Sequence, residues 1–138
     1  MTQPADKHAQ ICSLLFFPLS GVTAETTPGT PYIRITGTGE KIDFATAEFS
    51  ETAEENGQPI EQDFKATVTN TGTDVYIRLQ NLLATYGLLR IDYTNQTRHI
   101  IGTPDAPVFI SLKQSGTVAT LTLSFIRTSP EFSKILLT

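Results

Sequence analysis

The clearest pattern in the chain is a strict alternation of apolar and polar residues over 60–69. Ile60, Phe64, Ala66 and Val68 occupy even positions, with mostly charged or polar residues between them. Successive side chains of a β-strand point to opposite faces, so this pattern predicts a half-buried strand. Short segments rich in apolar residues predict further strands at 11–17, 32–36, 41–50, 88–94 and 97–101.

The period changes after residue 73, where apolar side chains recur at i, i+4, i+7, i+8 and i+11. The residues at this spacing are Val75, Leu79, Leu82, Leu83 and Tyr86. They share one helical face, which predicts an amphipathic helix at about 74–86. Thr73 or Asp74 can cap its start, and Gly87 can take a left-handed conformation after its last turn. We expect the apolar face of this helix to pack on a sheet as its main cover.

Two hairpins follow the helix. A turn at Asn95-Gln96 pairs Asp92 with His99, Ile91 with Ile100 and Tyr93 with Arg98, and it places Leu89, Ile91, Tyr93 and Ile100 on one face.

A turn at Ser115-Gly116 predicts the second hairpin, built from strands 107–113 and 117–126. Its pairs are Leu112 with Ala119, Ile110 with Leu121, and Val108 with Leu123. All six are apolar and lie on one face, and a slip of one residue would turn threonines inward. Strand 117–126 carries no obvious guard residue, so we expect its edge to be open.

These elements predict one domain, 1–138, with an N-terminal arm at 1–10 and a long loop at 18–31. The acidic stretch 51–59 ends in Asn56-Gly57, a signal for a tight turn, and 129–138 can add a last strand. The expected fold is mainly β (α+β): an antiparallel β-sandwich or partly open barrel with the one helix.

Charge is distributed unevenly. The net charge is −4, and eight acids lie between Glu40 and Lys65 against two bases, leaving six acids and eight bases elsewhere. A phosphate backbone would be repelled by the acidic segment and would meet no basic cluster, so no nucleic-acid partner is expected.

No apolar run approaches the roughly 20 residues of a spanning helix, so no membrane span is expected. The run at 11–19 has the length of a signal-peptide core, but its mixed-charge flank favours a strand. We therefore expect a cytoplasmic or virion-associated protein.

The segment GTPDAP, 102–107, has the composition of a ligand loop or of a corner. Pro104 and Pro107 cannot donate to a ladder, and Gly102 can adopt conformations closed to other residues. The segment lacks the Gly-Lys-Ser/Thr end of a phosphate loop. A corner between hairpins is favoured over a ligand loop.

The best candidate for chemistry is the Asp92–His99 pair. A carboxylate across a hairpin from an imidazole can orient it as a general base. No nucleophile is evident beyond Ser111 on a neighbouring strand, and the pair is expected on the solvent side, opposite Ile91 and Ile100. A surface charge pair is therefore favoured over a catalytic one.

Other candidates are weaker in chemistry. Cys12 with His8 or His99 would make a thiol dyad, but Cys12 lies in an apolar run and is expected to be a buried hydrophobe. The acidic segment 48–63 does not match a calcium loop, so a solvated acidic hairpin is favoured. Exposed aromatics for sugar stacking are few. The aromatic candidates for stacking on a sugar are Tyr32, Tyr93 and Phe109. From these observations we assign no catalytic, cofactor-binding or metal-binding residue and expect no cofactor.

The order of strands, one amphipathic helix and tight hairpins over residues 74–127 resembles the small β-sandwich proteins of phage tails and injection tubes. The segment GLLRIDYTNQTRHIIGTPDAPVFISL also resembles small uncharacterised prophage proteins. The resemblance implies a repeating structural subunit without catalytic residues, whose arm and loops 18–31 and 50–59 contact other subunits.

Three functions stay open at this point. The first is a non-enzymatic structural or assembly subunit that associates with itself or with a protein partner. The second is a small module that binds carbohydrate or protein. The third is a hydrolase that uses Asp92 and His99.

Overall fold

Two β-sheets and one short α-helix make up the described part of the chain, which comprises residues 10–27, 29–53, 59–68, 73–115, 120–129 and 132–136 of a computed structural model. The elements are β1 (Ile11–Pro18), a 3-10 turn η1 (Leu19–Gly21), β2 (Val22–Glu25), β3 (Tyr32–Gly37), β4 (Glu40–Ile42), β5 (Thr46–Thr52), β6 (Ile60–Val68), α2 (Thr73–Leu82), β7 (Gly87–Tyr93), β8 (Arg98–Ile101), β9 (Ser111–Ser115), β10 (Thr120–Ser129) and β11 (Lys134–Leu136).

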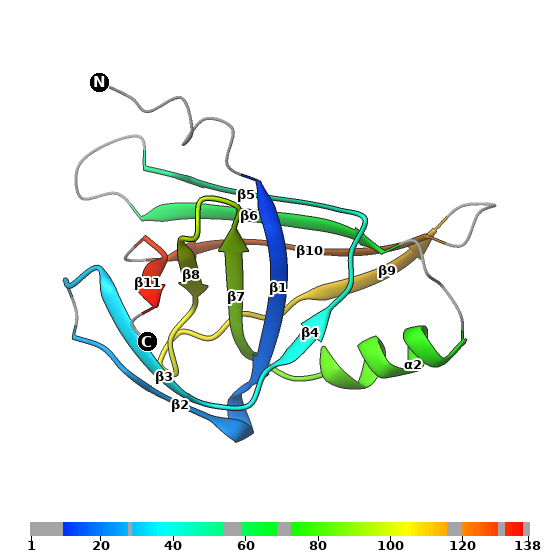
Figure 1. Ribbon diagram of the computed structural model, residues 1–138, viewed down its shortest axis with the longest axis horizontal. Coiled ribbons are helices and arrows are strands. Elements are labelled where there is room, and N and C mark those ends of the chain that lie inside the picture. Colours follow the sequence, from blue (N-terminus) through cyan, green and yellow to red (C-terminus); the bar gives the residue numbers. More distant parts are fainter. Residues whose placement is uncertain are drawn as a thin grey trace.

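The larger sheet has the strand order β2-β3-β11-β8-β7-β1-β4 and curls into an open half-barrel. The smaller sheet has the order β5-β6-β10-β9, and its strands run across those of the larger sheet (Figure 1). Every strand pair is antiparallel except β3 with β11, which are parallel. The prediction of a mainly β (α+β) fold is confirmed.

Strand β7 is buried on both faces because the larger sheet curls. Leu89 and Ile91 belong to the main core, which both sheets and α2 share. Leu88 alternates to the other face and packs in a second core with Ile33 and Ile100. The adjacent apolar residues Leu88 and Leu89 therefore mark a part of the strand that is covered on both sides.

The segment 41–50 is not one strand, as its composition predicted. Its first part, β4, pairs with β1 in the larger sheet, and its second part, β5, pairs with β6 in the smaller sheet. Residues 43–45 carry the chain from one sheet to the other. The long loop expected at 18–31 also contains a strand, β2, which pairs with β3.

The helix is shorter than predicted and is not the main cover of a sheet. It ends at Leu82, four residues before the expected end at 86. Leu79, Leu82 and Leu83 are buried, but Tyr86 is 55% exposed. The two sheets cover each other, and α2 lies at the end of the molecule where β4 and β9 are seen (Figure 1).

Gly87 does not terminate the helix in a left-handed conformation; it begins β7. A Cβ atom at this position would lie 2.3 Å from the Phe17 carbonyl oxygen and 2.6 Å from Cζ of Phe16. The glycine is needed because β1 passes too close for any side chain.

The β7–β8 hairpin is shifted by one residue from the predicted register. Asp92 pairs with Arg98, and Ile91 pairs with His99. Residues 94–96 form a three-residue loop, closed by the Tyr93 N–H donating to the Thr97 carbonyl at 2.9 Å, and Gln96 has φ +72°. A shift of one residue reverses the faces, so His99 points to the sheet interface and Ile100 to the second core.

The β9–β10 hairpin is shifted by four residues, with Leu112 opposite Leu123 and Gln114 opposite Leu121. An even shift preserves the faces, so the prediction that Leu121 and Leu123 point inward is confirmed. Ala119 lies outside the described residues. The expectation of an open edge here is wrong, because β10 lies between β6 and β9.

Residues 102–107 form a corner, as favoured, but the corner connects the two sheets rather than two hairpins of one sheet. Thr103 and Ala106 exchange backbone hydrogen bonds of 3.2 and 3.0 Å, and Gly102 has φ +94°. The last strand expected in 129–138 is β11. Asn56-Gly57 and residues 1–9 of the N-terminal arm lie outside the described residues.

Candidate functional site

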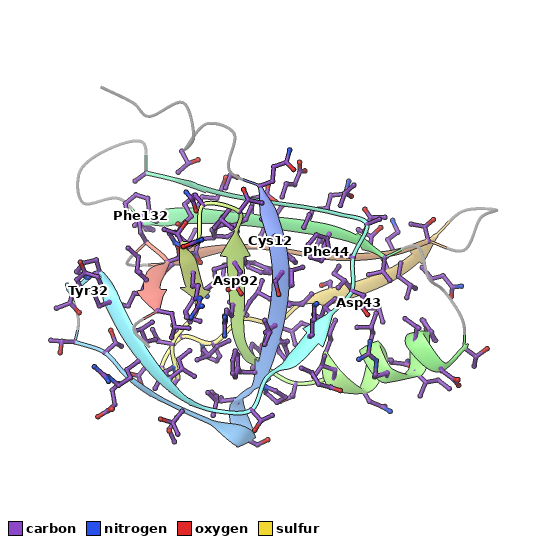
Figure 2. The ribbon with its side chains drawn as sticks, in the orientation of Figure 1. Cys12, Tyr32, Asp43, Phe44, Asp92 and Phe132 are labelled. Carbon is purple, nitrogen blue, oxygen red and sulfur yellow. The ribbon has the colours of Figure 1, made fainter. Side chains whose placement is uncertain are left out.

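The shifted hairpin separates the predicted pair Asp92 and His99. Asp92 lies on the face of β7 that points away from the sheet interface, and it accepts two hydrogen bonds from its neighbour Arg90 (Figure 2). The Arg90 Nε to Asp92 Oδ1 distance is 2.8 Å, and the Nη2 to Oδ2 distance is 3.0 Å. Asp92 therefore does not pair with His99, so the two residues form neither the favoured surface charge pair nor the alternative catalytic pair.

His99 instead joins a polar cluster between the two sheets. Its Nδ1 atom lies 3.0 Å from Oγ of Ser133, just before β11. The Ser133 hydroxyl donates to Oε1 of Glu51 on β5 at 2.7 Å, and the Ser133 N–H donates to Oε2 at 2.6 Å. Nε2 of Gln62 on β6 also donates to Oε2, at 2.8 Å. Glu51 thus binds β6 and the residue before β11 directly, and it is linked to β8 through Ser133.

The roles in this cluster follow from the donors available. An ionised carboxylate only accepts, so the Ser133 hydroxyl proton goes to Glu51, and the hydroxyl oxygen is left to accept from Nδ1–H of His99. Burial lowers the pKa of His99, and the Glu51 carboxylate partly opposes this by raising it. The lowered pKa favours the neutral imidazole, and with the Ser133 hydroxyl proton on Glu51 this imidazole carries its proton on Nδ1.

This order of donors is the reverse of a nucleophilic triad. There the serine donates its proton to the imidazole, which a carboxylate orients from the far side. Here the imidazole donates to the serine, and the carboxylate already accepts two further hydrogen bonds. We call this cluster of Glu51, Gln62, His99 and Ser133 the tie, because its hydrogen bonds link β5, β6 and β8 to the residue before β11.

A small cavity lies next to this tie. It has a volume of about 40 Å³, more than the roughly 10–15 Å³ that one water molecule needs. Two buried atoms of its lining residues, Oε1 of Gln62 and Nη1 of Arg127, have no hydrogen-bond partner among the described residues. Burial also lowers the pKa of Arg127. One water bonded to both atoms would satisfy an acceptor and a donor.

The other predicted candidates lie apart from one another. Cys12 is exposed rather than buried, and His8 lies outside the described residues. Glu48, Glu61 and Asp63 are exposed, as a solvated acidic hairpin requires, but Glu51 of the same segment is turned inward. No group of three or more His, Cys, Asp and Glu side chains among the described residues is placed to hold a metal ion.

A groove of about 430 Å³ runs along β5, between this strand and the start of β1. Its lining is partly apolar, from Ile11, Phe44, Ala45, Ala47, Phe49 and Tyr93, and partly polar, from Gln10, Thr46 and Glu48. Phe44 comes from the crossing segment between β4 and β5, seen beside β1 in Figure 2. The groove therefore opens where an edge of the smaller sheet passes over the larger sheet.

Of the aromatic side chains considered for sugar stacking, Tyr32 and Phe109 are exposed and Tyr93 is half-buried. Phe109 is not isolated: its ring centre lies 5.4 Å from that of Tyr86, with 51° between the planes. Tyr86 was expected in the helical core, so the sequence did not indicate this pair.

The chain matches no protein-family model, no curated protein and no solved structure. Within the described part of the chain, no helix has the length and apolar character needed to cross a membrane.

The tie at Glu51 was not found from the sequence because Glu51 and Ser133 are 82 residues apart. One feature of the sequence nevertheless pointed to a buried polar group in this region. Gln62 occupies an inward position in the alternation of β6, and it is 1% exposed. A buried amide needs partners, so this position indicated a polar group on a neighbouring strand.

Proposed function

We propose that the protein is a non-enzymatic structural subunit that assembles with copies of itself. The observation that carries this proposal is the outer edge of β5, with which no described strand pairs. Unpaired N–H and C=O groups along an edge strand are a template for another strand.

Four strands lie at sheet edges, and β5 is the longest of them. It has seven residues, whereas β9 has five, β2 has four and β4 has three. Short edges pair weakly, and β4 is also bridged to α2 by Glu40 and Arg78, 3.9 Å apart. The edge of β5 is therefore the best suited to accept a strand.

The sequence of β5, TAEFSET, carries few of the residues that protect an edge. It has no Lys and no Pro. Glu51 points inward, but three hydrogen bonds already satisfy its carboxylate. The one outward charge, Glu48, lies opposite Lys65 of β6. The charged residue directly across from Glu48 within the sheet is thus of opposite sign.

Light scattering and sedimentation of the full chain over a concentration series test the proposal. We expect the mass to rise above 15.1 kDa with concentration. A single species of that mass at all concentrations would refute self-assembly. The resemblance to phage-tail subunits belongs to this proposal too, and electron microscopy of concentrated samples tests it, with rings or tubes as the expected result.

A second candidate, a carbohydrate-binding module, is favoured by the exposed Tyr86–Phe109 pair. Two adjacent rings present the apolar surface on which a sugar stacks. Titration calorimetry with soluble oligosaccharides tests it, with Phe109→Ala as the variant. Heat of binding that Phe109→Ala abolishes would support this candidate, and no heat with any sugar would refute it.

A further inference from the structure

We propose that the outer edge of β5 pairs antiparallel with the same edge of a second copy, across a two-fold axis at Phe49. The four-stranded sheets of two copies would then form one continuous sheet. This inference rests on the proposed self-assembly. It specifies the contact surface, the pairing register of the two β5 strands and the symmetry of the dimer. Two-fold dimers are the commonest closed assemblies, and their interfaces pair one surface with itself.

The register follows from the bounds of the strand. Strand β5 runs from Thr46 to Thr52, so Phe49 is its midpoint. An axis there pairs all seven residues: Phe49 faces itself, Glu48 faces Ser50 of the second copy, and Glu51 faces Ala47. Any other axis leaves part of the strand unpaired.

The charges favour the same register. An axis at Glu48 would place two exposed carboxylates directly opposite each other, which is destabilising in a β-sheet. An axis at Ser50 would place Glu51 opposite the ring of Phe49. With the axis at Phe49, no carboxylate faces another, and Glu48 keeps Lys65 as its neighbour within its own sheet.

The groove beside β5 gives the inward side chains of the second strand a place to pack. Ala47, Phe49 and Glu51 alternate toward the groove and the main core, and Ala47 and Phe49 line the groove. In the dimer, Phe49 of the second copy would lie beside Phe49 of the first, above Phe44 and Tyr93. The apolar lining residues of the groove would lose part of their contact with water, which favours association.

Opposite charge changes at Ser50 test the register. Ser50 is exposed and would face Glu48 of the second copy, and each such pair occurs twice in a symmetric dimer. Ser50→Glu should raise the dimer Kd by roughly 2- to 30-fold, and Ser50→Lys should lower it by a similar factor. Sedimentation measures both values at two salt concentrations, since screening should reduce both effects.

Ser111 provides matched controls, because it is an exposed serine on β9, at the opposite edge of the same sheet. Ser111→Glu and Ser111→Lys should leave the Kd within about twofold of the parent protein, because surface changes away from an interface have small effects. Asp63 lies opposite Ser50 within the same sheet. Urea unfolding of each variant therefore checks that the monomer remains folded at the concentrations used.

Cross-linking gives an independent readout of the symmetry. Residues directly opposite in an antiparallel pair have Cα atoms about 4.5–5.5 Å apart, which suits a disulfide. In a Cys12→Ser background, Phe49→Cys should form a disulfide-linked dimer under mild oxidation. Leu112→Cys, a partly buried position on β9, should not.

The outcomes separate the inference from the proposed function. A monomer at all concentrations overturns both. Self-association that responds to Ser111 rather than Ser50, or that links through residue 112, overturns this inference and leaves the proposed function standing. A chain that dimerises only after removal of residues 1–9 also overturns it, because the chain's own N-terminal segment would then occupy the edge.

Discussion

Replacing Glu51 with alanine removes the shared acceptor of three hydrogen bonds, from Gln62 Nε2, Ser133 N and Ser133 Oγ. The Ser133 hydroxyl keeps a partner, because it can donate to His99 once the imidazole changes tautomer. The Gln62 amide and the Ser133 N–H do not. Each buried donor left without a partner costs about 1–3 kcal/mol, and Glu51→Ala should therefore reduce the free energy of unfolding by about 2–6 kcal/mol.

Urea unfolding followed by circular dichroism measures this change, and Glu48→Ala is the matched control. Glu48 lies on the same strand but is exposed, and the change should cost less than about 0.5 kcal/mol. Glu51→Gln keeps one acceptor oxygen, so its cost should fall between the two. If Glu51→Ala costs less than about 1 kcal/mol, or no more than Glu48→Ala, the carboxylate does not tie the strands together.

Three further predictions concern packing and pH. Leu82→Ala should lower the free energy of unfolding in urea by about 2–5 kcal/mol because Leu82 is buried in the main core. Ile77→Ala, on the exposed side of α2, should lower it by under about 1 kcal/mol. Equal costs would contradict the packing of α2 on the main core. Gly87→Ala should lower the melting temperature far more than Gly21→Ala, because a Cβ at Gly87 would clash with backbone and ring atoms, whereas one at Gly21 would meet nothing within 4 Å. Burial lowers the pKa of His99 in the folded state. The unfolded chain therefore binds more protons as the pH falls below about 6.5, and the free energy of unfolding should fall there. His99→Phe should flatten this part of the pH profile of stability, and an unchanged slope would contradict the role of His99.

The strands were predictable where one face is polar and the other apolar. In β6 the alternation predicted Ile60, Phe64, Ala66 and Val68 as inward residues, and all four are buried. The alternation survives in the structure because β6 lies between two other strands, with the main core on one face only. Element types were likewise correct for α2 and for most strands.

Register was predicted less well, because it depends on loop conformation. Two-residue turns were assumed at both hairpins. The loop 94–96 instead has three residues with Gln96 at positive φ, a conformation that a non-glycine residue rarely adopts. That one extra residue turned His99 inward and separated it from Asp92, its expected partner across the hairpin.

The tie at Glu51 could not be read from the sequence, because it depends on how the two sheets cross. Glu51, Gln62, His99 and Ser133 come from four separate stretches, and no local spacing brings them together. The acidic composition of 48–63 also misled the interpretation. A carboxylate that alternates inward does not belong to a solvated face, although its neighbours Glu48, Glu61 and Asp63 do.

Strand β5 serves the fold with its inward side chains and the proposed assembly with its outer edge. Its inward residues hold the strand in place: Phe49 and Ala47 pack on the main core, and Glu51 binds β6 and the residue before β11. Its outward residues, Glu48 and Ser50, are exposed and lie opposite Lys65 and Asp63 of β6. A change at Glu51 must therefore weaken folding and, through it, any assembly. A change at Ser50 should act on assembly while altering folding little, so comparing the two positions distinguishes a surface that is kept for a partner from one that only completes the fold.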